Sequence, residues 1–403
     1  MSPASRISRR PCPSCLGTEC VALHEQRFIL PEQHPLTSGY TVVSCEHCGL
    51  VYADIGASQE QFDEFYELSS KYEDAQTGTG GGLTSWDQNR LRDTAEEIAR
   101  HIPRGARILD LGCANGGLLD ELGKTGFAQL TGLDPSAACV ATTRALGFPC
   151  RQGFFTRLPS DFDTFDCVVL SHVMEHVLEV REAMHVLATI VPAGGYVYIE
   201  VPDASRYHQF LVAPFQDFNT EHINHFSEAS LDNLFHQFGF KRTAGGQKNI
   251  ASSSDSLTPA VWAVYRATGC ASMPVVKDRA LREALEIYIT DSRGLMGEID
   301  RHLTVSLTDS DSVIVWGTGQ LTMKLLCETV LAKHAIRVFV DSNPINQGKI
   351  IQGVRVISPR QLQNSNLGEP IVIGSLLHGR EIIAGIRDRY HLPNRLVEVR
   401  PAA

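Results

Sequence analysis

The stretch from Ala106 to Gly117 constrains the fold of this chain more than any other. It reads ARILDLGCANGG, in which Arg107 to Leu111 is a short apolar run typical of a buried parallel strand. The glycines that follow allow a turn whose backbone can approach a ligand closely, and a helix begins at Leu118. Ligands of open parallel sheets bind beyond the carboxyl ends of the strands, so this turn predicts a binding pocket.

A second strand supplies an acidic residue to the same pocket. The run from Leu130 to Leu133 is apolar and ends in Asp134. Because neighbouring parallel strands end at one edge of the sheet, we expect this carboxylate beside the glycine turn, placed to accept hydrogen bonds from two ribose hydroxyls. The two strands together predict a site for a nucleoside.

The glycine spacing indicates which nucleoside to expect. A dinucleotide site needs glycine at the first, third and sixth positions of the turn, where this chain has Gly112, Ala114 and Gly117. The set Asp110, Gly112 and Gly116 instead resembles the first motif of class I S-adenosylmethionine (SAM) methyltransferases. That resemblance implies a pocket for a cationic sulfonium donor, whereas a purely structural turn and an NAD site are the alternatives.

Length and charge narrow the class of protein. A chain of 403 residues favours two or three domains, and a net charge of −10 argues against a nucleic-acid groove. No apolar run approaches the roughly 18 residues of a membrane span, and no signal peptide follows the basic N-terminus. We therefore expect a cytoplasmic protein that binds small molecules and keeps its eleven cysteines reduced.

Two Cys-x-x-Cys pairs lie near the N-terminus, with 29 residues between them: Cys12, Cys15, Cys45 and Cys48. Two such knuckles form the closed four-thiolate shell of a structural zinc ribbon. A lobe this small needs a metal to fold, so we predict one structural Zn²⁺. A redox dithiol or chance spacing is the alternative, and His47 or Cys20 is a possible substitute ligand.

An acidic, aromatic segment from Ala57 to Gly82 follows the ribbon and ends in TGTGGG. Its aromatic residues are Phe62, Phe65, Tyr66 and Tyr72. The segment is interpreted either as a lid over the site or as a seal between the ribbon and the next domain.

Strand and helix patterns then alternate as far as residue 203, which predicts a doubly wound α/β sheet. The strand from Phe165 to Leu170 ends at a cleft, where we expect Ser171 and His172 to contact the donor. His176 follows Glu175 there and is a candidate acid-base residue. A purely structural Glu-His pair is the alternative.

The loop from Phe215 to Ser227 is polar and histidine-rich where the fold needs only a connector. Its Glu221, His222 and His225 form the best candidate for proton handling, because loops on rigid scaffolds carry catalytic groups. A second metal site and a solvated loop are the alternatives. Beyond Pro274, an amphipathic helix and the strand, glycine turn and helix of VIVWGTGQLTMKLL predict a second, Rossmann-like sheet that could hold phosphate.

Taken together, these features resemble the C-methyltransferases of deoxysugar and antibiotic biosynthesis. The resemblance rests on the four cysteines, the DLGCANG turn, Glu221-His222 followed by Phe226-Ser227, and the GTG turn with DSNPINQGK. It implies a zinc ribbon at residues 1–56, a SAM-dependent methyltransferase domain at 57–270, and a nucleotide-holding Rossmann-like domain at 271–403.

The resemblance also implies a substrate and roles for the site residues. The acceptor is expected to be a carbon next to a ketone in a nucleotide-linked sugar, with His222 as base, Glu221 as its orienter and His176 as enolate stabiliser or proton relay; His225 completes the predicted catalytic set. Family members commonly have tyrosine shortly before the Glu-His pair, where this chain has Phe218 and Asn219. They also have a tyrosine-rich segment after the ribbon, where this chain has LSSKYED. O- or N-methylation of another small intermediate, or a non-catalytic binding protein, are therefore the alternatives.

Overall fold

The computed structural model describes residues 5–68, 83–159, 162–253, 256–269 and 274–399. The chain divides into two compact units, one of residues 1–24, 41–210 and 221–285, the other of residues 25–40, 211–220 and 286–403. Among the described residues, no helix is long and apolar enough to cross a membrane. The predicted domain boundaries at 56 and 270 stay a prediction, and Tyr72, LSSKYED beyond Leu68 and the glycine run lie outside the described residues.

A five-stranded sheet surrounds the paired cysteines. Its strands, in spatial order, are β1 (Ser5–Ile7), β2 (Glu19–Arg27), β3 (Gly39–Cys45), β4 (Val51–Asp54) and β10 (Asn224–His225). The last of these comes from the predicted proton-handling loop and pairs antiparallel with β4, opposite Val51 and Tyr52. Backbone hydrogen bonds thus join the cysteine-bearing segment to that loop.

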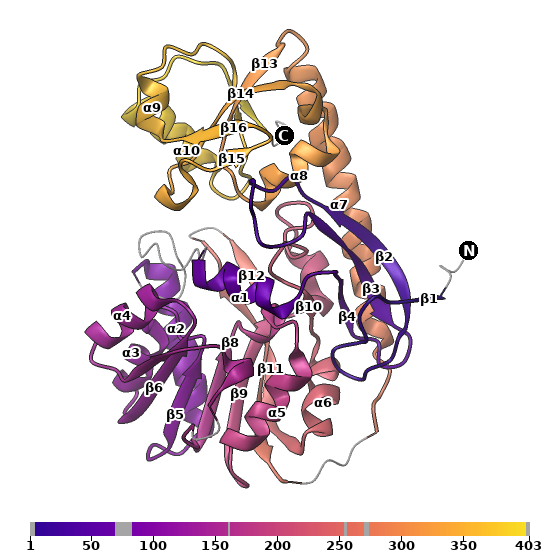
Figure 1. Ribbon diagram of the computed structural model, residues 1–403, viewed down its shortest axis with the longest axis vertical. Helices are drawn as coiled ribbons and strands as arrows, with labels where there is room; N and C mark the ends of the chain where they lie inside the picture. The colour runs from indigo at the N-terminus through magenta and orange to yellow at the C-terminus, as the bar shows by residue number, and fades with distance from the viewer. Residues whose placement is uncertain (1–4, 69–82, 160–161, 254–255, 270–273, 400–403) are drawn as a thin grey trace. The chain divides into compact units, whose positions relative to one another are not determined.

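The central sheet of the first unit has seven strands (Figure 1). In spatial order they are β11 (Phe240–Ala251), β12 (Leu257–Ala267), β9 (Tyr196–Pro202), β8 (Cys167–Ser171), β5 (Arg107–Leu111), β6 (Gln129–Asp134) and β7 (Cys150–Gln152). The five strands from β9 to β7 are parallel, whereas β12 is antiparallel to both of its neighbours. This is a doubly wound α/β sheet, as the sequence predicts.

Helices bury both faces of this sheet. On one face α2 (Ser85–His101), α3 (Gly117–Lys124) and α4 (Ala137–Ala145) pack over Ile108 and Val169. On the other face α5 (Val180–Ile190) and α6 (Glu228–Gln237) pack over the alternate residues of the same strands, such as Leu109 and Val168. Strands buried on both faces must be apolar throughout, which explains the continuous apolar runs in the sequence.

Short elements connect these layers in the first unit. They are α1 (Gln59–Leu68), η2 (Phe155–Arg157), η3 (Met174–His176) and η4 (Ala204–Phe210). Side-chain caps begin several of the helices: Thr84 accepts from the amide of Asp87 in α2, and Ser227 and Ser230 form a capping box at α6. Such caps satisfy amides that have no partner within the helix.

The second unit contains a six-stranded sheet, mainly parallel as predicted, in the order β15 (Ile350–Ile351), β16 (Val354–Ile357), β14 (Ala335–Val340), β13 (Ser312–Trp316), β17 (Ile371–Ile373) and β18 (Leu396–Glu398). Its other elements are α8 (Gln320–Glu328), η5 (Val330–Lys333), η6 (Pro344–Asn346), α9 (Pro359–Gln363), α10 (Gly379–Ala384) and η7 (Gly385–Arg389). The predicted amphipathic helix is α7 (Arg279–Ser306). Its Tyr288 contacts the ring of Phe218, which is fully buried in this unit.

Candidate active site

Asp134 ties the glycine turn to the end of the neighbouring strand. Its carboxylate accepts hydrogen bonds from the backbone N–H of Ala114 at 2.8 Å and of Ser136 at 2.9 Å. Ala114 lies in the left-handed region, with a φ of 45°, which costs free energy for a residue with a Cβ. The Asp134 bond helps to offset that cost and fixes the direction of the turn.

Packing as well as ligand access requires the glycines of this turn. Gly112 has a φ of 71°, and a Cβ there would lie 2.8 Å from Cγ2 of Val173. Gly116 has a φ of 79°, and its Cβ would meet Oγ1 of Thr143 at 3.0 Å. A larger residue at either position would thus distort the turn even before a ligand binds.

Asp110 is a buried carboxyl group with an unusual protonation equilibrium. It lies at the end of β5 and is 2% exposed. Burial, together with the negative charge of Asp134, raises the pKa of Asp110 to about 8. Two neighbouring buried acids fit a positively charged ligand, because such a ligand would offset their repulsion.

His172 connects two buried carboxylates just beyond β8. Its Nδ1 lies 3.2 Å from Oε1 of Glu175, and its Nε2 lies 3.3 Å from Oε1 of Glu200. Burial opposes protonation of this ring, but the two carboxylates outweigh it and raise the pKa of His172. The expected donor contacts of Ser171 and His172 stay a prediction, while the His172 ring is engaged with acids of the protein.

Glu175, His176 and His222 converge from two segments of the chain. One nitrogen of each histidine and one carboxylate oxygen of Glu175 all lie within 4.8 Å of one another. The two imidazole rings are 4.8 Å apart in an edge-to-face arrangement. Nδ1 of His176 donates to the carbonyl oxygen of Glu221 at 3.1 Å, which leaves Nε2 of His176 on the side of Glu175. The structure thus brings together His176 and His222, which the sequence picked from separate segments.

Tyr66 and Glu175 lie in this cluster, although they are not among the catalytic candidates predicted from the sequence. The Tyr66 ring, on α1, lies edge-to-face against His176 with centroids 5.7 Å apart. This contact favours the lid interpretation for part of the aromatic segment. The fully buried Phe62 fits the sealing interpretation instead.

His225 lies in different surroundings from the other predicted catalytic residues. It belongs to β10, is fully buried, and contacts the ring of Tyr207 at a centroid distance of 6.1 Å. Burial, and the positive charge of Arg10, lower the pKa of His225 to about 3. The ring is therefore neutral at physiological pH, and its catalytic role stays a prediction.

Arg10 holds the two histidine-bearing segments together. Its guanidinium donates to the carbonyl oxygens of Leu178 at 3.2 Å and Ile223 at 3.3 Å, and to Oδ1 of Asn224 at 3.2 Å. Leu178 follows the turn of His176, and Ile223 follows His222. Because Arg10 lies two residues before Cys12, the cysteine knuckle and the candidate active site share this support.

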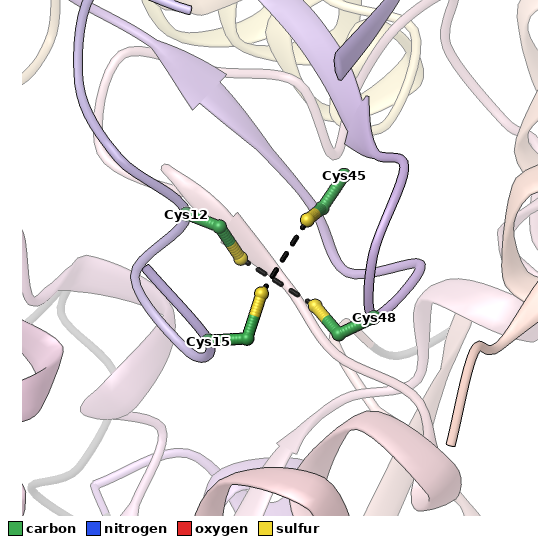
Figure 2. A group of neighbouring side chains, drawn as sticks. All are labelled: Cys12, Cys15, Cys45 and Cys48. Carbon is green, nitrogen blue, oxygen red and sulfur yellow. Dashed lines mark hydrogen bonds between the residues drawn. The ribbon is translucent and has the colours of Figure 1, made fainter. Parts of the chain in front are cut away.

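The four predicted cysteine ligands point toward one centre (Figure 2). The Sγ atoms of Cys12 and Cys48 are 3.5 Å apart, as are those of Cys15 and Cys45. A tetrahedral zinc with sulfur at about 2.3 Å implies sulfur separations of about 3.8 Å, so the set fits this metal. Gly49 has a φ of 81° beside Cys48, and a Cβ there would lie 2.2 Å from the carbonyl oxygen of Asp278.

The second unit contains a turn built in a similar way. Asp341, after β14, accepts a hydrogen bond from the backbone N–H of Thr318 at 3.0 Å, and also one from its hydroxyl group. Its other oxygen accepts from the amide of Asn343 at 2.8 Å. The side chain of Asp341 thus orders the GTG turn, as Asp134 does in the first unit.

Comparison with known proteins identifies one region of the chain. Residues 83–244 match the family model described as a methyltransferase domain. The ubiquinone biosynthesis O-methyltransferase of Methylocella silvestris is 32% identical over 108 residues, covering 25% of this chain and 42% of that protein. The enzyme of the same name from Rhizobium leguminosarum bv. trifolii is 33% identical over 156 residues, covering 35% and 61%.

A solved S-adenosylmethionine dependent methyltransferase from Mesorhizobium loti is 17% identical, with a TM-score of 0.36, and the match covers 44% of this chain and 99% of that one. The chain spans less than two thirds of the length of both curated relatives. Residues 83–244 contain both the Asp110 turn and the Glu175, His176 and His222 cluster. This region of the chain is a methyltransferase domain with the class I α/β fold.

Proposed function

We propose that this protein transfers a methyl group from SAM to a carbon beside the ketone of a nucleotide-linked sugar. The observation that carries the proposal is the cluster of Glu175, His176 and His222 within one methyltransferase domain. A carbon acid is not nucleophilic until it loses a proton, so carbon methylation needs a base held near the donor. Methylation of a more acidic heteroatom needs less help of this kind.

The donor site consists of the glycine turn with Asp110 and Asp134. Asp134 accepts hydrogen bonds from the two amides described above, and we assign it the ribose hydroxyls as well, because a carboxylate can accept several hydrogen bonds. The buried Asp110 fits the cationic methionine part of the donor, which supplies an electrophilic methyl group when bound. Gly112 and Gly116 let the backbone turn without a side chain in the way.

The protein's own groups handle the proton. His222 takes the proton from the carbon beside the ketone, and the electron pair of that C–H bond moves into the enolate. His176, with its Nδ1 fixed on the carbonyl oxygen of Glu221, is placed to stabilise the enolate oxygen or to relay the proton. We assign Glu221 as orienter of His222 and add Glu175, whose carboxylate is close to both rings.

We further propose that Cys12, Cys15, Cys45 and Cys48 hold one structural Zn²⁺. The four thiol groups lie within 4.8 Å of one another. Four thiolates complete the tetrahedral coordination of zinc and leave no position for substrate or water, so the proposed role is architectural. We propose a nucleotide-holding role for the second unit, in which Asp341 orders a glycine turn. A cytoplasmic location accords with a nucleotide-linked substrate.

O-methylation of a small biosynthetic intermediate is the second candidate. The observation that favours it is that the curated relatives described above are O-methyltransferases by name. To decide between carbon methylation and O-methylation, the full chain is incubated with methyl-labelled SAM and a panel of nucleotide-linked ketosugars and phenolic acceptors. A product labelled on carbon supports the first proposal, a product labelled on oxygen supports the second, and an unlabelled panel argues against both.

A further inference from the structure

A chain of charged groups, of which the two glutamates are buried, leads from Lys248 to the histidine cluster. Nζ of Lys248 lies 2.5 Å from Oε2 of Glu200, whose other oxygen lies 3.3 Å from Nε2 of His172. Nδ1 of His172 lies 3.2 Å from Oε1 of Glu175, and the same oxygen lies 3.9 Å from Nε2 of His176. Glu200 and Glu175 are 0% and 1% exposed, so water screens these charges little.

The geometry determines the charge of His172. Ionised carboxylates only accept hydrogen bonds, and a neutral imidazole has only one N–H to donate. With one carboxylate oxygen at each ring nitrogen, both contacts are hydrogen bonds only when the ring is an imidazolium. The same two carboxylates outweigh the burial of the ring and raise the pKa of His172.

The far end of the chain is built to keep Glu200 ionised. Besides Lys248, the carboxylate of Glu200 accepts from the hydroxyl groups of Tyr198 at 2.7 Å and Thr94 at 3.2 Å. Burial opposes ionisation of Glu200, but Lys248 and His172 outweigh it and lower its pKa. A group with this many donors is a fixed negative charge, and it anchors Nε2 of His172.

We propose that His172 is a positively charged positioning residue that fixes the Glu175 carboxylate and offsets its charge, so that His222 stays a neutral base. This inference rests on the proposed role of His222. Without the cation, the full negative charge of Glu175 would act on His176 and His222 and hold a proton on them. The basic form of His222 would then be scarce at neutral pH.

The proposal predicts opposite pH shifts for two variants. His172→Gln removes the positive charge, so the pKa of His222 should rise and the acidic limb of kcat/KM should move to higher pH. Glu175→Gln removes the negative charge, so the same limb should move to lower pH. Each shift should be about one pH unit or more, as expected for a charge a few ångströms from a buried imidazole.

The described part of the structure shows which charged and titratable groups contact this set of charges. Glu175 on η3 and Glu200 on β9 face His172, with Lys248 and Tyr198 behind Glu200. Tyr66 and His222 face His176.

The first test needs no substrate. The full zinc-loaded chain, labelled with ¹³C in its histidine rings, is titrated by NMR, and the His172 signal is assigned by its loss in His172→Gln. We expect His172 to keep its proton to a higher pH than an ordinary histidine, and its pKa to fall in Glu200→Gln, which removes one of its two carboxylate partners. A His172 ring that titrates near pH 6.5 in the wild type would overturn the proposal.

The second test uses the acceptor found with the substrate panel. His172→Gln and Glu175→Gln should shift the acidic limb in opposite directions. His172→Arg restores a cation that can donate N–H groups to both carboxylates, so it should return the limb toward the wild type. The exposed His185 on α5 supplies a matched control, because His185→Gln should leave the profile unchanged. Shifts in the same direction, or lower activity with no shift, would overturn the role assigned to His172.

The two tests separate failure of this inference from failure of the proposed function. If the panel yields no methylated product but NMR shows a protonated His172, the charge assigned to His172 stands and the proposed methylation of a nucleotide-linked sugar is wrong. If carbon methylation is found while His172 titrates as an ordinary histidine, the proposed function stands and the role assigned to His172 is wrong. Metal analysis is the last check. A second metal ion that is present in the wild type and lost in Glu175→Gln would mean that Glu175 binds a metal, and it would overturn the role assigned to His172.

Discussion

The carboxylate of Asp134 holds the backbone N–H of Ala114 at 2.8 Å, and so joins the end of β6 to the left-handed residue of the glycine turn. Asp134→Ala removes this acceptor and the expected acceptor of the ribose hydroxyls. We expect donor affinity to fall by about 1.5 to 3 kcal/mol, which is roughly tenfold or more. Calorimetric titration with SAM measures this loss.

The matched control for that experiment is Asp120→Ala. Asp120 is a half-exposed acid of α3 that pairs with Lys124, so its removal changes the net charge equally without touching the turn. Donor affinity should be unchanged in this variant. Equal affinities of the wild type and Asp134→Ala would show that the donor site lies elsewhere.

Asp110 gives a prediction about pH and stability. The folded-state pKa of about 8 lies above the ordinary value near 4, so the folded protein binds a proton that the unfolded chain releases between these values. Stability should therefore decrease as pH rises from 4 toward 8. Asp110→Asn removes this titration, so its Tm in the absence of donor should exceed that of the wild type at pH 8, with a smaller difference at pH 5.

The same Asp110→Asn variant should bind SAM more weakly, because the amide cannot offset a cationic ligand. Thermal unfolding with and without donor measures both effects. A Tm difference that does not change with pH would mean that Asp110 is ionised throughout and that its predicted pKa shift is wrong.

Removal of zinc should affect more than the cysteine knuckles. Cys48→Ser opens the four-thiolate shell, and metal binding in such a lobe contributes directly to folding. Arg10 lies two residues before Cys12 and bonds the carbonyl oxygens of Leu178 and Ile223. Hydrogen exchange should therefore speed up in β1 to β4 and also in the segment of His222.

The contrasting variant is Cys20→Ser, which changes a buried cysteine outside the four-thiol set. It should retain one zinc per chain by metal analysis. Purified wild-type protein without zinc, with the four thiols freely titratable, would contradict the assignment.

His225 predicts loss of stability in acid. Its folded-state pKa is lowered to about 3, whereas an unfolded histidine titrates near 6.5. The unfolded state therefore takes up a proton first, and stability present above pH 6.5 is lost as pH falls toward 3, at up to about 1.4 kcal/mol per pH unit. His225→Phe should flatten the dependence between pH 6.5 and 4.5, measured by denaturant unfolding. An unchanged slope would place the acid sensitivity elsewhere.

The sequence predicted the features that depend on local spacing. The Cys-x-x-Cys pairs, the DLGCANG turn and the apolar runs of the parallel sheet each carry their signal within a few residues, and the structure contains all of them. The caps at Ser136 and Ser227, which begin α4 and α6, are local features of the same kind.

The features that the sequence could not predict depend on contacts between distant segments. His222 and His225 occur in one short run, but only pairing of β10 with β4 shows that His225 is enclosed while His222 meets His176. The acids on both sides of His172 come from η3 and β9, and no local pattern joins them. Tyr66 gave no signal that would separate a site aromatic from a sealing one.

The most direct test of the central claim follows the acidic hydrogen of the acceptor. In deuterated water, with S-adenosylhomocysteine in place of the donor, the wild type should exchange the hydrogen beside the ketone of a nucleotide-linked sugar. His222→Ala should lose both this exchange and methylation, by a factor of about 10² to 10⁴, while still binding SAM. If His222→Ala exchanges and methylates at the wild-type rate, carbon-acid catalysis by this histidine is contradicted.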